Sequence, residues 1–169
     1  LPAVDAVAWR TGPDRCRVRT AAGEAAFSRT EHKTIACAIR AGDPFGWSGI
    51  VDADAVHAPR RWLQLTAATR YPDLPAQILS YFDAPRAGDL AIFAAPGWDF
   101  GKTNRAGHGG IRGPEDLHVP LLLAGPRIPK GRLETARTAD LVPTLLNVFG
   151  RYPPPGIDGR SLLAETPAR

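Results

Sequence analysis

Hydrophobic and polar positions alternate with a period of two through the first part of the chain. The stretches "VDAVAW" and "CRVRT" are separated by the turn residues "RTGPDR", and "AAGEAAF" follows with Gly23 as a second turn. Alternation interrupted by short turns is typical of antiparallel strands. Residues 1–50 are therefore predicted to form a small antiparallel meander, which ends where the glycines and the proline of "AGDPFGW" interrupt a regular ladder.

The period becomes helical between residues 54 and 82. Pro59 suits the first turn of a helix over "APRRWLQLTAATR", and Asp73 is predicted to cap a second helix with apolar residues on one face. A third helix is predicted over "TADLVPTLLNVFG", with Asp140 as its N-cap and Gly150 at its end.

Two continuous apolar runs, "GDLAIFAAPG" and "VPLLLAGP", are bounded by glycine or proline. Runs of this kind are typical of strands that are covered on both faces of a parallel sheet. We therefore expect strands at residues 89–95 and 119–124 to be neighbours or near neighbours in one mostly parallel sheet. The third helix would pack on that sheet through Leu141, Leu145 and Val148, which share a face at helical spacing. The predicted fold class is thus α/β, a mostly parallel sheet with flanking helices, preceded by the small antiparallel meander.

Composition and charge exclude several functions. The formal net charge of +4 comes from arginines that occur in every segment, and they do not form one stripe with interleaved aromatics, which argues against specific nucleic-acid binding. Cys16 and Cys37 lie far apart without CxxC spacing, so they are expected to be small buried residues and not zinc ligands or a redox pair. No apolar run approaches the ~20 residues that cross a bilayer. The opening "LPAVDAVAWR" and the absence of Met suggest a piece of a longer chain.

A polar, glycine-rich loop, "GWDFGKTNRAGHGGIRGPEDLH", lies between the two apolar runs. It contains His108 within "AGHGG", and an imidazole can bind a metal through either ring nitrogen. Flanking glycines would let the backbone turn sharply and approach the metal closely. The local pattern leaves two interpretations open: a metal ligand, or a solvated histidine among glycines that serve only as turn formers.

The order of motifs in the second half of the chain bears on this choice. "GDLAIFAAPG", "GHGG", "EDLHVPLLLAGPRI", "RTADLVPTLLNVFG" and "GIDGRSLL" follow one another over about residues 70–163. This order resembles the closing segment of the alkaline phosphatase superfamily, especially its type I phosphodiesterase/nucleotide pyrophosphatase branch and, second, its sulfatase-like branch. In that pattern a His-Gly after a core strand precedes a "VPL" strand, a "DL-PTLL" helix and a final "DG-SL" turn.

The resemblance implies a role for His108 as ligand of one of two catalytic divalent metal ions, usually zinc. It also implies a Thr or Ser nucleophile (a modified Cys or Ser in sulfatases) and further Asp and His ligands, for which this chain has no matching segment. Residues 1–50 would then be the end of an inserted cap region, and residues 51–169 the C-terminal part of the α/β catalytic core. Because a catalytic zinc ordinarily needs three protein ligands, the isolated chain is expected to be inactive.

Other residues of the loop are weaker candidates. Asp99, Lys102 and Arg105 share it with His108 and could approach a substrate. Glu115 and Asp116 resemble a carboxylate pair for acid–base work, but we expect them to make hydrogen bonds that fix the loop.

Three functions follow as hypotheses. The first is the C-terminal portion of a metal-dependent hydrolase of phosphate diesters or monoesters, with a small phosphate ester or a nucleotide as substrate and the rest of the parent chain as partner. The second is a sulfatase of the same superfamily, because the absent nucleophile decides between the two esters. The third is a non-catalytic interaction or structural domain that retains the fold.

Overall fold

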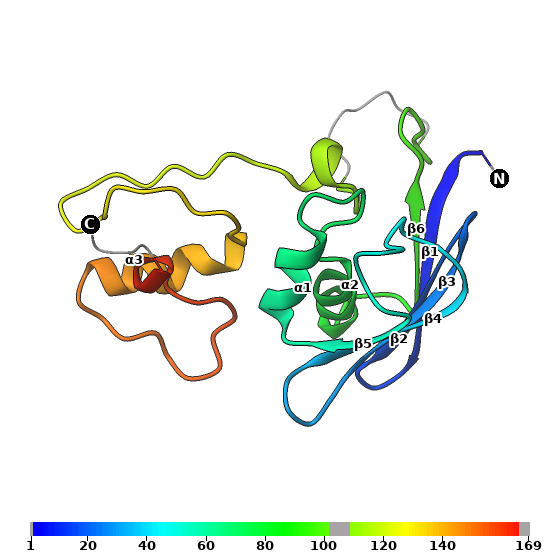
Figure 1. Cartoon of the computed structure of the whole chain (residues 1–169), viewed down its shortest axis with the longest axis horizontal. Coiled ribbons are helices and arrows are strands. Elements are labelled where there is room, and N and C mark those ends of the chain that lie inside the picture. The colour runs from blue at the N-terminus through cyan, green and yellow to red at the C-terminus, as the bar shows by residue number, and fades with distance from the viewer. Residues whose placement is uncertain (1, 102–108, 166–169) are drawn as a thin grey trace. The chain divides into compact units, whose positions relative to one another are not determined.

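The computed structural model describes residues 2–101 and 109–165, which belong to two compact units, Leu1–His118 and Val119–Arg169. The first unit contains a six-stranded sheet with the strand order β5-β4-β3-β2-β1-β6 (Figure 1). All five pairs of neighbouring strands are antiparallel. The strands are β1 (Val4–Gly12), β2 (Arg15–Thr20), β3 (Gly23–Arg29), β4 (Ile35–Gly42), β5 (Asp54–His57) and β6 (Leu90–Ala94).

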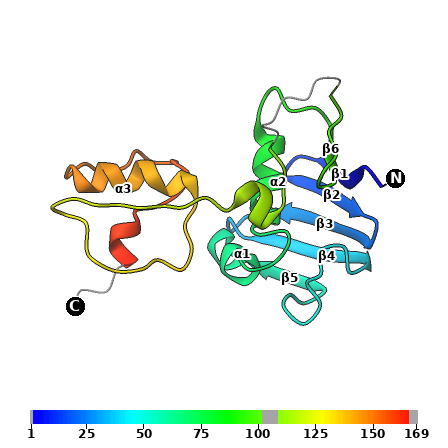
Figure 2. The ribbon, with the colours of Figure 1, turned by 90° about the horizontal axis from the view of Figure 1, so that it is seen from above.

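Two helices, α1 (Pro59–Thr66) and α2 (Leu74–Asp83), lie on one face of this sheet (Figures 1 and 2). Alternate residues of the strands point toward them, and Ala8, Val18 and Phe27 are almost completely buried there. A layer of aromatic side chains fills the space between sheet and helices: Phe27, Phe45, Trp47, Trp62 and Tyr71. The period-two pattern of the sequence thus reflects one covered face.

Two buried polar side chains fix the helices. Trp62 Nε1 donates to the carbonyl of Ile35 at 2.9 Å, which ties α1 to β4. Thr66 Oγ1 donates to the carbonyl of Trp62 and accepts the backbone N–H of Asp73, both at 2.7 Å. The start of α2 is therefore bonded to the end of α1. Asp73 occupies the N-cap position of α2, as predicted, but its side chain makes no capping hydrogen bond.

The prediction of a mostly parallel sheet is wrong, because every strand pair of the observed sheet is antiparallel. β6, which was expected to be a parallel strand covered on both faces, pairs antiparallel with β1 and forms the edge of the sheet. Residues 119–124 form no strand, and Val119 and Leu122 are 72% and 90% exposed. A continuous apolar run indicates hydrophobicity but contains no information on strand direction or partner. The antiparallel pairing expected within residues 1–50 is present, while their assignment to a cap region stays a prediction.

The second unit contains the helix α3 (Leu141–Val148) and two short 3-10 turns, Thr138–Asp140 and Leu162–Glu165. The expectation that Leu145 faces a sheet is wrong, because this side chain is 47% exposed. Asp140 is buried, and its carboxylate accepts the backbone N–H groups of Arg137 at 2.8 Å and Arg160 at 3.0 Å. Asp140 therefore connects the start of α3 with the segment that returns after it.

Among the described residues, no helix is long and apolar enough to cross a membrane. A five-residue π-helical turn, Gly113–Leu117, ends the first unit.

Asp140→Asn should loosen the second unit alone. The new amide nitrogen cannot accept a hydrogen bond, so one backbone N–H partner loses its acceptor, at a cost of about 1–3 kcal/mol. Hydrogen exchange should become faster in α3 and around residue 160, while β2 and β3 keep their protection. Asp158→Asn, at an exposed position nearby, is the control. Unchanged exchange in α3 would contradict the role given to Asp140.

Candidate functional site

The loop that follows β6 begins and ends beside the start of β1. At its beginning, the N–H of Ala95 donates to the carbonyl of Ala3 at 2.9 Å. At its end, the guanidinium of Arg112 binds the carboxylate of Asp5 with two hydrogen bonds, one of them from Nε at 2.9 Å. Ala3 and Asp5 are separated by one residue, so residues 96–111, here called the β6 loop, are closed at their base. Surface loops whose ends lie close together are frequently functional.

Asp5 is the centre of a polar cluster in which Asp5, Tyr71 and Arg112 are buried and Arg70 is exposed. Asp5 is 8% exposed, and Arg112 is 9% exposed. Tyr71 Oη donates to Asp5 Oδ1 at 2.9 Å, and Arg70 Nη2 lies 3.5 Å from the same oxygen. Burial and the hydrogen bond to Asp5 raise the pKa of the Tyr71 phenol well above its ordinary value. The phenol therefore stays protonated and acts as a donor. We call Asp5, Arg70, Tyr71 and Arg112 the Asp5 cluster.

Asp116 fixes the same end of the loop from the other side. Its Oδ2 accepts the backbone N–H of Arg112 at 3.1 Å, which confirms the hydrogen-bonding role predicted for this acid. A Cβ on Gly110 would lie 2.0 Å from Asp116 Oδ2, so a larger residue would displace the carboxylate that accepts from Arg112. Gly113 lies against the backbone of Thr69, whose carbonyl oxygen would be 3.1 Å from an added Cβ, a tight contact. Gly109 and Gly110 of "AGHGG" have no positive φ, so neither makes the sharp turn that we expected of them, and Gly107 lies outside the described residues.

The structure locates the predicted site residues only in part. His108, Lys102 and Arg105 lie outside the described residues, and their roles stay predictions. Asp99 is described, and its Oδ1 accepts the N–H of Gly101 at 2.8 Å, so this carboxylate closes a local turn.

Sequence reasoning missed the Asp5 cluster. A signal was present, because Asp5 is an acid inside the otherwise alternating stretch "VDAVAW" and Arg112 follows an apolar residue in "GGIRGP". Their pairing spans 107 positions, however, and no local pattern connects them.

Within the described ranges there is no group of three or more His, Cys, Asp or Glu side chains that could hold a metal ion. A catalytic zinc ordinarily needs three protein ligands. The described residues therefore do not form a metal site by themselves, and the implied pair of metals would need ligands from elsewhere.

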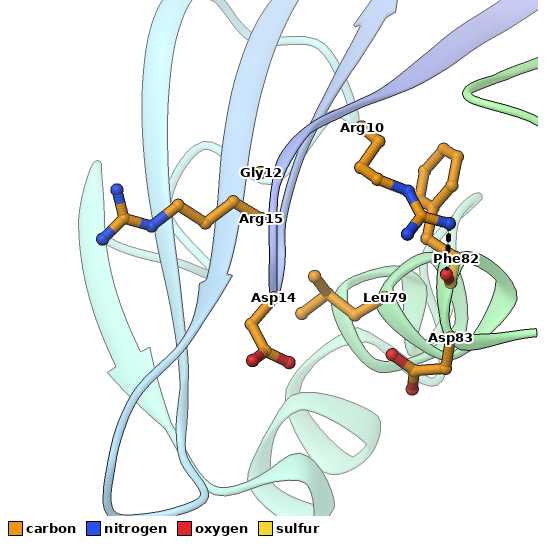
Figure 3. A pocket seen from close by; sticks show the side chains of 7 residues that line it. All are labelled: Arg10, Gly12, Asp14, Arg15, Leu79, Phe82 and Asp83. Atoms are coloured by element: carbon orange, nitrogen blue, oxygen red, sulfur yellow. Dashed lines mark hydrogen bonds between the residues drawn. The ribbon is translucent and has the colours of Figure 1, made fainter.

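A second feature is an open hollow of about 240 Å³ between the β1–β2 turn and the end of α2 (Figure 3). Its charged groups are already engaged: Arg29 binds both Asp14 and Asp83, and Arg10 donates to the carbonyl of Phe82 at 2.6 Å. Arg15 points away from the hollow (Figure 3). These contacts join α2 to the sheet at the end of β1 opposite to the Asp5 cluster. The charged residues around the hollow therefore have a structural role, because they hold α2 against the sheet. Its lining residues are Arg10, Gly12, Asp14, Arg15, Leu79, Phe82 and Asp83.

Comparison of the chain with protein-family models, curated proteins and solved structures finds no match. The resemblance to the alkaline phosphatase superfamily therefore rests on the order of sequence motifs alone, and one of those motifs, "VPLLLAGP", does not form the expected strand.

Asp5→Asn should destabilise the first unit by about 3–5 kcal/mol, because it leaves the buried Arg112 guanidinium without its counter-charge. Urea unfolding followed by tryptophan fluorescence measures the change. Arg112→Lys should also be costly, since a lysine cannot make the two parallel hydrogen bonds. The control is Arg17→Gln, which removes the exposed pair with Glu24 and should cost less than about 1 kcal/mol. Equal effects at Asp5 and Arg17 would contradict a special role for the cluster.

Proposed function

We propose that this chain is part of a metal-dependent hydrolase of phosphate esters, to which it contributes His108 as a metal ligand. The observation that carries the proposal is the ordered series of motifs between residues 70 and 163, with a His-Gly between the two apolar runs. A fold prediction made from the same motifs was wrong, so the proposal concerns the site and not a parallel sheet.

The closed base of the β6 loop supports this proposal. A ligand that binds a metal must be held in a narrow range of positions, and the described residues on both sides of the loop are bonded to the start of β1. The Asp5 cluster and Asp116 provide this anchoring at one end, and the Ala95–Ala3 hydrogen bond provides it at the other. Within the chain, the work of Asp5 and Arg112 would be to hold the loop and not to contact substrate.

In the proposed parent protein, two divalent metals, usually zinc in such enzymes, would activate a nucleophile and neutralise phosphoryl oxygens. The remaining ligands and the nucleophile would come from the rest of that parent. Asp99, Lys102 and Arg105 would lie on the same loop as the ligand, which makes them candidates for contacts with a small phosphate ester or nucleotide.

Hydrolysis of p-nitrophenyl phosphodiester, phosphomonoester and sulfate tests the proposal, with and without a chelator. The parent should cleave a phosphate ester, lose activity with chelator, and lose most of its activity on His108→Ala while it keeps its fold. The isolated chain should turn over none of the three substrates.

His32→Ala is the matched control, because His32 is an exposed histidine in the β3–β4 turn and should be replaceable without loss. The proposal fails if His108→Ala retains the parent's activity, if the chelator has no effect, or if the isolated chain is active. Preferential cleavage of the sulfate would identify the sulfatase alternative instead.

A further inference from the structure

The outer edge of β6 has the properties of a strand that pairs with another strand. β6 is the last strand of the sheet, and among the described residues no strand lies beyond it. Leu90 and Ile92 are 54% and 50% exposed on the sheet face that carries no helix. Val7 and Trp9 of β1, which lie directly opposite Ile92 and Leu90, extend this apolar surface. An exposed apolar edge strand is a template for pairing with another chain.

The backbone groups of the same residues point outward. The N–H of Arg10 donates to the carbonyl of Asp89, so residue 89 directs its backbone groups toward β1. In an antiparallel pair this direction alternates along the strand. Residues 91 and 93 therefore also face β1, while the N–H and carbonyl groups of Leu90, Ile92 and Ala94 face the open edge.

The two edges of the sheet differ in their protection. The other edge strand, β5, has four residues and carries Asp54 and His57, and short or charged edge strands resist pairing. β6 contains no charged residue and no proline within Leu90–Ala94. Asp89, next to it, has its carboxylate 3.9 Å from the guanidinium of Arg10. Because Leu90–Ala94 contains no charged residue, no like charges would meet within the paired segments if two copies of β6 came together.

We propose that β6 pairs with β6 of a second copy of this chain, antiparallel and about a two-fold axis through Ile92. In this register Ile92 lies opposite Ile92, Leu90 lies opposite Ala94, and the outward backbone groups of each strand face those of the other. The two-fold axis places the apolar faces of both sheets on the same side. The helices lie away from the new edge, because α2 packs chiefly over β2, β3 and β4 and reaches β1 only near its end at Arg10. The inference does not rest on the proposed function.

The interface is expected to be reversible. Five residues a side is small beside the roughly 20–30 residues a side of a standard interface, so the dimer should dissociate on dilution. Sedimentation of the 169-residue chain over a wide concentration range should show a monomer–dimer equilibrium. Ile92→Lys should abolish it, since two like charges would meet on the axis. Val56→Lys, at a 56% exposed position of β5, should leave it unchanged.

A cysteine pair tests the register. Ile92→Cys should form a disulfide-linked dimer under mild oxidation, because residues directly opposite in a hydrogen-bonded pair have Cα atoms about 5.5 Å apart. Leu90→Cys, which is equally exposed, should not, since the two copies of residue 90 would lie beyond the ~7 Å that a disulfide can bridge. Native Cys16 and Cys37 are buried and should not interfere.

The proposal is overturned if the chain is monomeric at all concentrations, if Ile92→Lys still dimerises, or if Leu90→Cys cross-links as readily as Ile92→Cys. If Val56→Lys also abolishes association, β6 of one copy pairs with β5 of the next. Such head-to-tail pairing would form an open chain of copies and not a two-fold dimer, and it would also overturn the proposal.

Discussion

The two hydrogen bonds between Arg112 and Asp5 join residues 107 positions apart, and much of the first unit depends on them. Asp5 lies at the start of β1, at the point where the β1–β6 register shifts between Val4 and Ala6. An unpaired charge at a buried position is strongly destabilising, so each partner requires the other. One contact thus fixes the start of the sheet, the segment after α1 through Tyr71 and Arg70, and the end of the β6 loop.

The second constraint is that helices cover only one face of the sheet. Because α1 and α2 together pack mainly against β2, β3, β4 and β5, most large side chains of the core gather there, while β1 and β6 contribute Ala6, Ala8, Ala91 and the partly buried Phe93 to the covered face. Because side chains alternate along a strand, Leu90 and Ile92 of β6 lie on the other face, which no helix covers. The one-sided cover of the sheet therefore exposes the surface through which a second strand can pair.

The sequence allowed some of this structure to be predicted and not the rest. The meander and the starts of α1 and α2 depend on local signals, namely alternation, Gly23, Pro59 and the apolar face of residues 74–82, and these are present. The sheet type could not be read from "GDLAIFAAPG", because β6 acquires its direction from β1, far away in the sequence. The base of the β6 loop likewise depends on a long-range ion pair. His108 lies outside the described residues, so its role as a metal ligand stays a hypothesis.

The second unit shows how far polar contacts can replace an apolar core. Several of its large apolar side chains are exposed, with Leu122, Phe149 and Tyr152 at 75% or more. Burial of such side chains is the main source of folding free energy, so this unit forgoes much of it. Leu162 and Pro143 are buried, and beside them the buried Asp140 and Thr144 bond α3 to the backbone of Arg137, Arg160 and Leu162. A unit held in this way is specific in geometry but weak in stability, because each net hydrogen bond contributes only about 1 kcal/mol.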